Sequence, residues 1–307
     1  MRQKHSAAII GPGRIGKVYL RELIKLKYSE IFLFGGKKKP DFNKIDFIKN
    51  LVKKKILKIK YYKNLNEKIK ECSVVCICSP SNTHLKYIKL LENTKVKIIV
   101  EKPLISLEDL NKINISKFLF QNILKKRKVL CSYPVRFYAK EIKKIIKTKK
   151  IKYIKFKYHT TGKNTYEHIP EDLLPHAISF IFEFFKKKVN NLSKFKKNQF
   201  KNKWNCTFQI EKTNIIFDFK QNIKAKESKL EIFLNDFKIS RYTKSLSNSD
   251  LDVFLKINNK KHKIKNPMSE NIIYNHNRLI KHKKLLFDYN INYNIILLIK
   301  RFIEDEK

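Results

Sequence analysis

Two groups of residues in this chain have types and spacings that could do chemistry. The first is a glycine triplet, Gly11, Gly13 and Gly16, and the second is Asp172 with His176, a carboxylate and an imidazole four residues apart. Glycines at this spacing let backbone N–H groups approach a phosphate. A histidine can accept and return a proton near neutral pH. These patterns predict a dinucleotide site and a proton-transferring group.

An apolar run, Ala7–Ile10, precedes the glycine triplet, and an amphipathic helical pattern follows it. Strand, Gly-x-Gly-x-x-Gly and helix in this order form the dinucleotide-binding fingerprint. Gly11 permits the tight turn, Gly13 leaves room for a pyrophosphate, and Gly16 lets helix and strand pack closely. Only six glycines occur in 307 residues, and three of them are here. The predicted binding residues of this loop are Gly11, Gly13, Arg14, Ile15 and Gly16.

Strands and helices alternate through residue 133, which predicts a doubly wound parallel sheet covered on both faces. We therefore expect an α/β chain with an N-terminal Rossmann domain over residues 1–133. A capping box at Ser106 predicts a helix that continues toward Lys126. The expected strands are Ala7–Ile10, Ile31–Phe34, Ile56–Tyr61, Ser73–Ser79, Val96–Glu101 and Val129–Tyr133.

The end of the second expected strand bears on the choice of coenzyme. An acidic residue there would hydrogen-bond the ribose 2′-hydroxyl of NAD, but this chain has Gly35, Gly36 and three lysines. Lysines could bind a 2′-phosphate instead, which slightly favours NADP over NAD. Gly35, Lys37 and Lys38 are accordingly predicted to contact the cofactor.

From residue 151 the pattern changes to alternation with period two, typical of an antiparallel sheet with one wet face. We expect residues 134–307 to form a C-terminal α+β domain with a predominantly antiparallel open sheet, which binds substrate and could support a homo-oligomer. Helices are expected over 269–282 and 293–303, and the lysine-rich stretch 186–203 is expected to be a loop.

Pro175 constrains the segment that carries Asp172 and His176. Proline is tolerated only in the first turn of a helix, so the helix is expected to start near Leu173 with Asp172 as its N-cap. The positive end of the helix dipole favours the neutral imidazole of His176, which could then accept a proton. The alternative is that His176 merely packs beside a capping aspartate.

The composition is extremely basic, with 70 Lys and Arg against 27 Asp and Glu, a formal charge of +43. Such a charge binds polyanions non-specifically, so a nucleic-acid-binding protein is a rival interpretation. The lysines are spread along the whole chain, however, and only eight of the basic residues are arginines. Because arginine is the preferred reader of phosphates and base edges, we expect no specific nucleic-acid partner and attribute the charge to a compositional bias.

No stretch of 18 apolar residues occurs, and the first strand leaves no room for a signal peptide, so no membrane association is expected. The five cysteines have no zinc spacing and are interpreted as thiols in a reducing cytoplasm. We therefore expect a cytoplasmic protein without a bound metal.

Four further segments match motifs of a known family. They are Ser79 to His84, Glu101-Lys102-Pro103, Tyr133 to Phe137, and Asp172 to His176. Together with the glycine loop they resemble the Gfo/Idh/MocA family, the oxidoreductases related to glucose–fructose oxidoreductase and inositol dehydrogenase. Two departures stand out. Pro134 occupies a place where asparagine is usual, and the small glycine cluster that often precedes the aspartate is absent.

The resemblance implies an NAD(P)-dependent enzyme that moves a hydride between nicotinamide and a carbinol or carbonyl carbon of a sugar or nucleotide-sugar-like substrate. In this interpretation Lys102 polarises the oxygen, His176 moves the proton, and Asp172 orients one of the reactants. The alternative is a catalytically silent coenzyme-binding sensor or scaffold. Further cofactor contacts implied by the resemblance are Ser79, Pro80, Asn82, His84, Glu101, Lys102 and Arg136.

Overall fold

The structure is a computed structural model that describes residues 6–36, 46–54, 56–148, 150–162, 168–185, 192–225, 228–245, 251–281 and 285–304. The chain divides into two compact units. Of the described residues, unit 1 contains those up to Ser132 together with Met268–Asn292, and unit 2 contains the rest. The sequence prediction had assigned residues 268–292 to the second domain.

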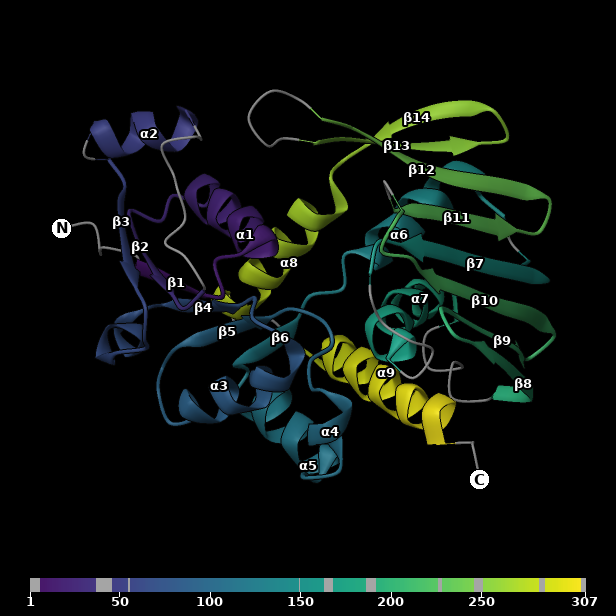
Figure 1. The fold of residues 1–307 in the computed structure, drawn as a ribbon, viewed down its shortest axis with the longest axis horizontal. Coiled ribbons are helices and arrows are strands. Elements are labelled where there is room, and N and C mark those ends of the chain that lie inside the picture. Colours follow the sequence, from purple (N-terminus) through teal and green to yellow (C-terminus); the bar gives the residue numbers. More distant parts are fainter. Residues whose placement is uncertain are drawn as a thin grey trace. The chain divides into compact units, whose positions relative to one another are not determined.

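Unit 1 is built on a six-stranded sheet, sheet A, in the order β3-β2-β1-β4-β5-β6, and every neighbouring pair is parallel (Figure 1). This is the doubly wound Rossmann arrangement that the sequence predicted. Five of its strands are almost wholly buried, as expected for a parallel sheet between helices, whereas the edge strand β3 is exposed or half-buried. The strands are β1 (Ser6–Ile10), β2 (Glu30–Phe34), β3 (Lys58–Tyr62), β4 (Val74–Ile77), β5 (Lys97–Val100) and β6 (Val129–Cys131).

The helical segments of unit 1 connect these strands. The expected N-cap at Ser106 is confirmed, because its hydroxyl accepts from the Asp109 backbone N–H. The Asp109 carboxylate accepts from this hydroxyl, whereas in a full capping box it would accept from the Ser106 backbone N–H. The single helix expected from there to Lys126 is wrong, since Asn114 caps a new helix by accepting from the Lys117 N–H at 3.0 Å. The segments are α1 (Arg14–Lys25), α2 (Asp46–Lys53), η1 (Glu67–Glu71), η2 (Ser81–Thr83), α3 (His84–Leu90), α4 (Leu107–Leu110), α5 (Ile115–Leu119) and the π-helical η3 (Phe120–Lys125).

A late helix, α8 (Pro267–Ile280), packs in unit 1. Its Asn271 amide donates to the Ser132 hydroxyl at 2.6 Å, and its Asn275 amide donates to the Cys131 carbonyl at 3.1 Å. These bonds join α8 to the last strand of sheet A and the residue after it. A helix that lies more than 130 residues after the last strand of sheet A therefore completes the first unit.

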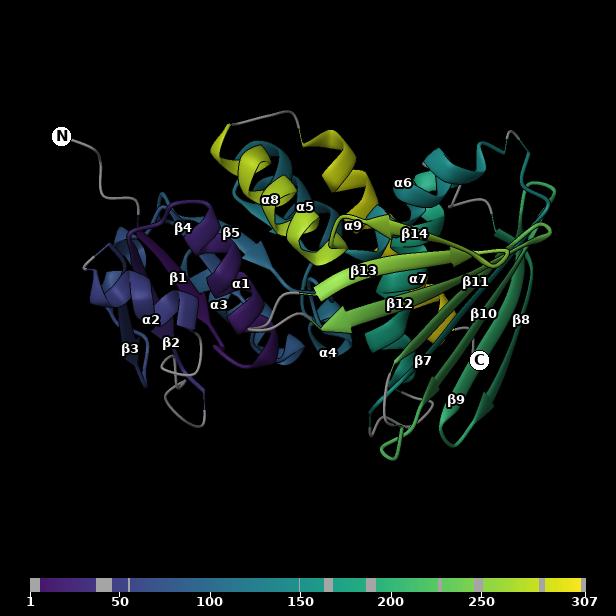
Figure 2. The ribbon, with the colours of Figure 1, turned by 90° about the horizontal axis from the view of Figure 1, so that it is seen from above.

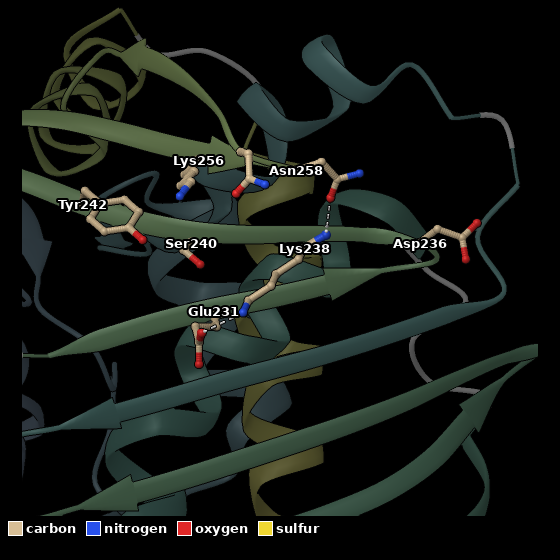
Figure 3. Close-up of a pocket in the computed structure, with 8 residues that line it drawn as sticks. Glu231, Asp236, Lys238, Ser240, Tyr242, Lys256 and Asn258 are labelled. Atoms are coloured by element: carbon tan, nitrogen blue, oxygen red, sulfur yellow. Dashed lines mark hydrogen bonds and ion pairs between the residues drawn. The ribbon is translucent and has the colours of Figure 1, made fainter.

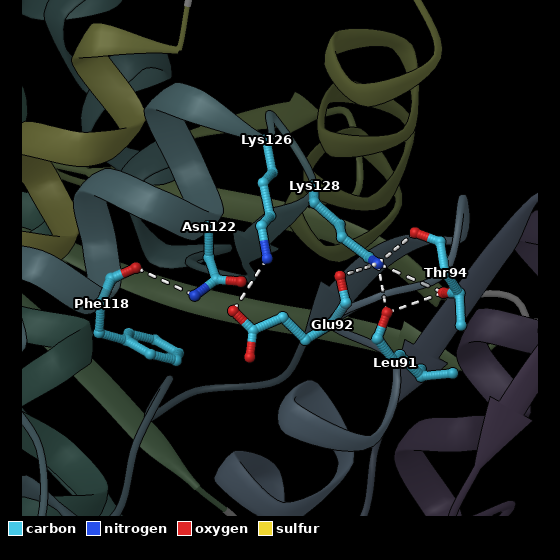
Figure 4. A network of polar contacts seen from close by, with 7 residues as sticks. All are labelled: Leu91, Glu92, Thr94, Phe118, Asn122, Lys126 and Lys128. Carbon is cyan, nitrogen blue, oxygen red and sulfur yellow. Dashed lines mark hydrogen bonds and ion pairs between the residues drawn. The ribbon is translucent and has the colours of Figure 1, made fainter.

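A buried lysine fixes the end of α3 (Figure 4). The Lys128 ammonium donates to the backbone carbonyls of Leu91, Glu92 and Thr94, which follow the last turn of that helix. Carbonyls at a helix C-terminus lack intrahelical partners and carry the negative end of the dipole. The side chain just before β6 thus holds the end of a helix that precedes β5.

Unit 2 contains an eight-stranded sheet, sheet B, in the order β14-β13-β12-β11-β7-β10-β9-β8 (Figure 2). Every neighbouring pair is antiparallel except β7 with β10, which confirms the predicted class. The strands are β7 (Tyr153–Thr160), β8 (Leu192–Phe200), β9 (Lys203–Ile210), β10 (Thr213–Gln221), β11 (Lys229–Leu234), β12 (Phe237–Ser245), β13 (Leu251–Ile257) and β14 (Lys260–Ile264).

The apolar face of sheet B carries an aromatic core. Phe156 of β7 lies 5.4 Å from the ring of Phe180 on α7 (Ile169–Phe185), and Trp204 stacks on Phe219 at 5.6 Å. Phe302 of α9 (Leu286–Glu304) contacts the same cluster. Helix α6 (Val135–Ile146) packs against α7 on this face, and the alternation of the strands leaves the other face polar.

The expectation of a loop over residues 186–203 is wrong where the structure describes that stretch. Residues 192–200 form β8, an edge strand paired with β9. Most of its outward side chains are lysines and other polar groups, which protect an edge from pairing with other chains. In the described part of the chain no helix is long and apolar enough to cross a membrane.

Candidate functional site

The glycine loop lies where the strand order of sheet A reverses, between β1 and β4. Open α/β sheets bind ligands at this edge. Gly11 has a φ of +81°, and a Cβ there would lie 2.8 Å from the Ser79 backbone nitrogen. A Cβ on Gly16 would lie 2.5 Å from the Gly11 carbonyl oxygen, whereas one on Gly13 would meet nothing within 4 Å. Two glycines are thus required by packing, and the third faces open space at the start of α1.

The first N–H groups of α1 complete this cradle. Helix α1 starts at Arg14 with Gly13 as its N-cap, and no acidic side chain lies in its first turn. N–H groups of a first helical turn have no intrahelical acceptor and attract anions. The exposed Arg14 and half-buried Ile15 stand beside them. The residues present therefore fit a pyrophosphate group.

The turn after β4 lies next to the glycine loop. The Ser79 hydroxyl shares a 2.7 Å hydrogen bond with the Thr83 hydroxyl, and Thr83 also donates to the Pro80 carbonyl at 2.7 Å. These bonds close the turn on itself. Pro80 and Asn82 are exposed at its surface, where they could meet a ligand.

His84, a predicted cofactor contact, lies in the protein interior. It is buried, with its Nδ1 2.8 Å from the Pro103 carbonyl oxygen and its Nε2 2.8 Å from the Ser79 carbonyl oxygen. Burial lowers the pKa of His84, while its backbone hydrogen bonds oppose that shift. The ring therefore ties the turn after β4 to the turn after β5.

Glu101 and Lys102 follow β5 at the same edge of the sheet. The Glu101 carboxylate accepts a 2.7 Å hydrogen bond from the hydroxyl of Tyr19, a fully buried residue of α1. Desolvation raises the pKa of Glu101, and hydrogen bonds from Tyr19 and Ser132 lower it. This carboxylate joins the β5 turn to α1. Lys102 comes next, half-buried, with a cis peptide bond to Pro103.

The end of β2 bears on coenzyme choice. Gly35 and Gly36 have φ values of +75° and +96°, which glycine adopts without strain. The Gly11 N–H donates to the Phe34 carbonyl at 2.9 Å, so this turn adjoins the glycine loop. The predicted contacts Lys37 and Lys38 lie outside the described residues.

In unit 2, α7 starts earlier than expected. It begins at Ile169, so Asp172 lies inside the first turn and is not the N-cap, and Pro175 lies within the helix. Asp172 and His176 still lie one turn apart on α7. The Asp172 carboxylate accepts a 2.7 Å hydrogen bond from the buried amide of Gln221 on β10. This positioning amide was not predicted.

The imidazole of His176 contacts an aromatic ring. Tyr158 of β7 lies edge-on to it, with ring centroids 5.4 Å apart. The guanidinium carbon of Arg241 on β12, a residue that the sequence did not point to, lies 5.9 Å from the centroid of the Tyr158 ring. One signal could have found it, since arginine is scarce among the 70 basic residues of the chain.

Arg136 was predicted to contact the cofactor. It is buried on α6, and its Nε donates to the Glu183 carboxylate of α7 at 2.8 Å. The pair joins two helices of unit 2. This ion pair accounts for the burial of Arg136 without a cofactor.

A hollow of about 440 Å³ lies elsewhere in unit 2, on the polar face of sheet B (Figure 3). Lys238 reaches the Glu231 carboxylate at 4.0 Å within it. Its lining residues come from β11, β12 and β13 and from the turns that follow β11 and β13, so none of the predicted site residues takes part. They are Glu231, Asp236, Lys238, Ser240, Tyr242, Lys256, Asn258 and Asn259.

Comparison with known proteins confirms the family resemblance. Residues 5–117 match the Gfo/Idh/MocA family, described as an oxidoreductase family with an NAD-binding Rossmann fold. The match identifies the N-terminal part of the chain as that of an NAD-binding oxidoreductase, the class of enzyme that the sequence predicted. No curated protein matches the sequence.

Solved structures of similar fold extend over the whole chain. A dehydrogenase from Clostridium difficile has a TM-score of 0.66 at 15% identity and covers 99% of this chain and 100% of its own. A UDP-N-acetylglucosamine 3-dehydrogenase from Acidithiobacillus ferrooxidans has a TM-score of 0.64 at 10% identity, with 98% of both chains covered. An oxidoreductase from Agrobacterium radiobacter, solved with NAD⁺, L-tartaric acid and magnesium, has a TM-score of 0.61 at 11% identity, covering 99% and 97%. At these identities the likeness concerns the fold.

Proposed function

We propose that this chain is a dehydrogenase that transfers a hydride between a nicotinamide coenzyme and a carbinol or carbonyl carbon of a sugar-like substrate. The observation that carries the proposal is the cradle at the switch point of sheet A, where Gly13 opens onto the N-terminus of α1. The family match and the sugar dehydrogenase among the structures of similar fold support the same reaction class.

The residues that would hold the coenzyme belong to unit 1. The α1 N–H groups would bind the pyrophosphate, and the turns that carry Ser79 and Lys102 would flank the nicotinamide. When bound, the nicotinamide ring supplies or accepts the hydride. His84 and Glu101 would act by fixing those turns, because their polar atoms already contact protein groups.

Three residues would act on the substrate itself. His176 would take the hydroxyl proton during oxidation and return it during reduction. Lys102 would polarise the substrate oxygen and stabilise its developing charge. Asp172, itself held by Gln221, would orient the imidazole or the substrate.

A single-turnover experiment tests these roles. The protein is mixed with oxidised coenzyme and a panel of sugars, inositols and nucleotide sugars, and reduction is followed by absorbance. Lys102→Ala and His176→Ala are each expected to slow turnover about a hundredfold or more, the scale of acid–base catalysis, while the circular dichroism spectrum stays unchanged. Full activity in both variants would falsify the assignment, and coenzyme binding without turnover on any substrate would indicate the silent sensor instead.

The coenzyme is proposed to be NADP or NAD, with NADP slightly favoured. The support is the absence of a carboxylate directly after β2, where Gly35 and Gly36 stand instead. Fluorescence titrations with NADPH and NADH at constant ionic strength test the preference. Equal affinities, or tighter binding of NADH, would remove it.

A further inference from the structure

One arginine of unit 2 lies partly buried beside two tyrosines. Arg241 of β12 pairs across the sheet with the buried Leu255, on the face that α6 and α7 cover. Its Nη2 donates to the Ser228 carbonyl at 2.9 Å, and the hydroxyls of Tyr138 and Tyr158 interact with its guanidinium and raise its pKa against the effect of burial. Among the residues that the structure describes, no aspartate or glutamate forms an ion pair with it.

A guanidinium withdrawn from water is costly unless a negative charge compensates it. Tyr138 does not supply that charge near neutral pH, because burial raises the pKa of its hydroxyl above the ordinary value of a phenol. The three groups can, however, bind an anion together. A guanidinium offers planar paired donors that match a carboxylate or a phosphate, and each hydroxyl can turn its proton toward the same oxygen atoms.

The position of this group relates it to the predicted acid–base residue. The strand register places Tyr158 opposite Leu230, and its continuation places Leu230 opposite Arg241, so the three form one row across β7, β11 and β12. The arginine reaches over Leu230 to Tyr158, with its guanidinium carbon 5.9 Å from the ring centroid. The same tyrosine ring contacts the imidazole of His176. An anion bound by Arg241 would therefore lie one aromatic ring away from that imidazole.

We propose that Arg241, with the hydroxyls of Tyr138 and Tyr158, binds a carboxylate or phosphate group of the substrate beside His176. The inference rests on the proposed function, in which His176 meets the substrate. It narrows the substrate class to sugars that carry an anionic group, either sugar acids or sugars bearing a phosphate.

Three sugars that differ only at carbon 6 test the proposal: glucose, glucuronate and glucose 6-phosphate. Their binding to the protein saturated with NADH or NADPH, a state without turnover, is measured by calorimetry at constant 150 mM salt. At least one anionic sugar is expected to bind about tenfold or more tightly than glucose. The sugar acid and the sugar phosphate distinguish the two sources of the anion.

Matched variants separate this site from the general positive charge. Arg241→Gln is expected to abolish the preference for the anionic sugar, and Arg241→Lys to keep only part of it, because an ammonium lacks the paired donors. Lys256→Gln removes the same charge from the polar face of sheet B and is expected to keep the preference. Should Arg241→Gln fail to fold, Tyr158→Phe provides the test, since it keeps the arginine and removes one hydroxyl; it is expected to weaken the preference.

Equal binding of the three sugars, binding of none, or a preference that survives Arg241→Gln overturns the proposal. So does a preference that Lys256→Gln removes to the same extent. The proposed function fails separately, if the titration that precedes the sugar measurement detects no coenzyme binding.

Discussion

Individual glycines of the first loop have separate physical roles. A Cβ on Gly16 would lie 2.5 Å from a backbone oxygen, whereas a Cβ on Gly13 would touch no protein atom within 4 Å. The first position is therefore constrained by packing. The second position, Gly13, has open space beside it, so we infer that a bound ligand is what excludes a larger side chain there.

We predict that Gly16→Ala mainly lowers stability and that Gly13→Ala mainly weakens coenzyme binding. Gly16→Ala is expected to destabilise the fold by about 1–3 kcal/mol, because the backbone must shift to relieve the overlap. Gly13→Ala is expected to keep the stability and to weaken coenzyme binding about tenfold or more. Thermal melts and fluorescence titrations measure the two effects. A Gly13→Ala protein that binds the coenzyme normally would contradict the cradle.

Side chains also hold elements together at single points, and Lys128 is a buried, charged example. Its ammonium serves three carbonyls at the end of α3. We predict that Lys128→Met lowers the free energy of unfolding by about 2–4 kcal/mol, since these carbonyls lose a charge-assisted donor within the protein. Urea unfolding measures the loss. The exposed Lys112→Met, which breaks only surface ion pairs, is the control and should change stability by less than about 1 kcal/mol.

At the scale of elements, sheet B is joined on its polar face by cross-strand pairs. Asp218 of β10 accepts from His159 of β7 at 3.4 Å, and Lys155 lies 3.9 Å from the same carboxylate. The hydrogen bond with His159 lowers the pKa of Asp218, and desolvation opposes it. These contacts lie on the parallel pair of strands in the middle of the sheet.

The lowered pKa of Asp218 predicts the sign of a pH effect. A carboxyl whose pKa is lower in the folded state stabilises the fold above its unfolded pKa, about 3.9, and this stabilisation is lost as the pH falls through the folded value. We expect Asp218→Asn to be less stable than the wild type at pH 6 and to lose less stability between pH 5 and pH 3. Unfolding curves at several pH values measure both. Parallel curves for the two proteins would show that the pair contributes nothing.

Elements also show where local patterns suffice and where they do not. The strands of sheet A and the glycine loop were predicted, because each is encoded within about ten consecutive residues. The start of α7 was not, since Pro170 and Pro175 both allow a first turn and packing selected the earlier one. Strand β8 was missed because its lysines hide the alternation of an exposed edge.

The candidate site was predicted only where sequence neighbours form it. The motifs around Ser79, Glu101 and Asp172 are contiguous, so their placement at strand ends and on one helix could be derived. The partners Gln221 and Arg241 could not, because their contacts join residues that are far apart in sequence. Gln221 of β10 lies 49 residues from Asp172 of α7, and the row from Tyr158 to Arg241 depends on how β7, β11 and β12 pair. The same holds for α8, whose return to unit 1 no local pattern indicates.

At the scale of the whole molecule, the charge of +43 dominates long-range interactions. We predict that duplex DNA binds the protein at 50 mM salt without sequence preference. Because counterion release drives such binding, the affinity is expected to fall about a thousandfold or more by 200 mM salt. Fluorescence anisotropy with two unrelated duplexes measures this. Binding that persists at 200 mM salt and prefers one duplex would favour the nucleic-acid-binding alternative over a compositional bias.

The place of β7 in sheet B has a consequence for biosynthesis. Both of its neighbours, β10 and β11, come later in the chain, beginning at Thr213 and Lys229. When β7 leaves the ribosome it therefore has no partner strand on either edge. Its apolar residues Ile154 and Phe156 stay uncovered until about 60 further residues have been synthesised. The first sheet has no such delay, because β1 pairs with β2 a short distance on. The nascent second half is thus the part of this protein with the greater need of a chaperone.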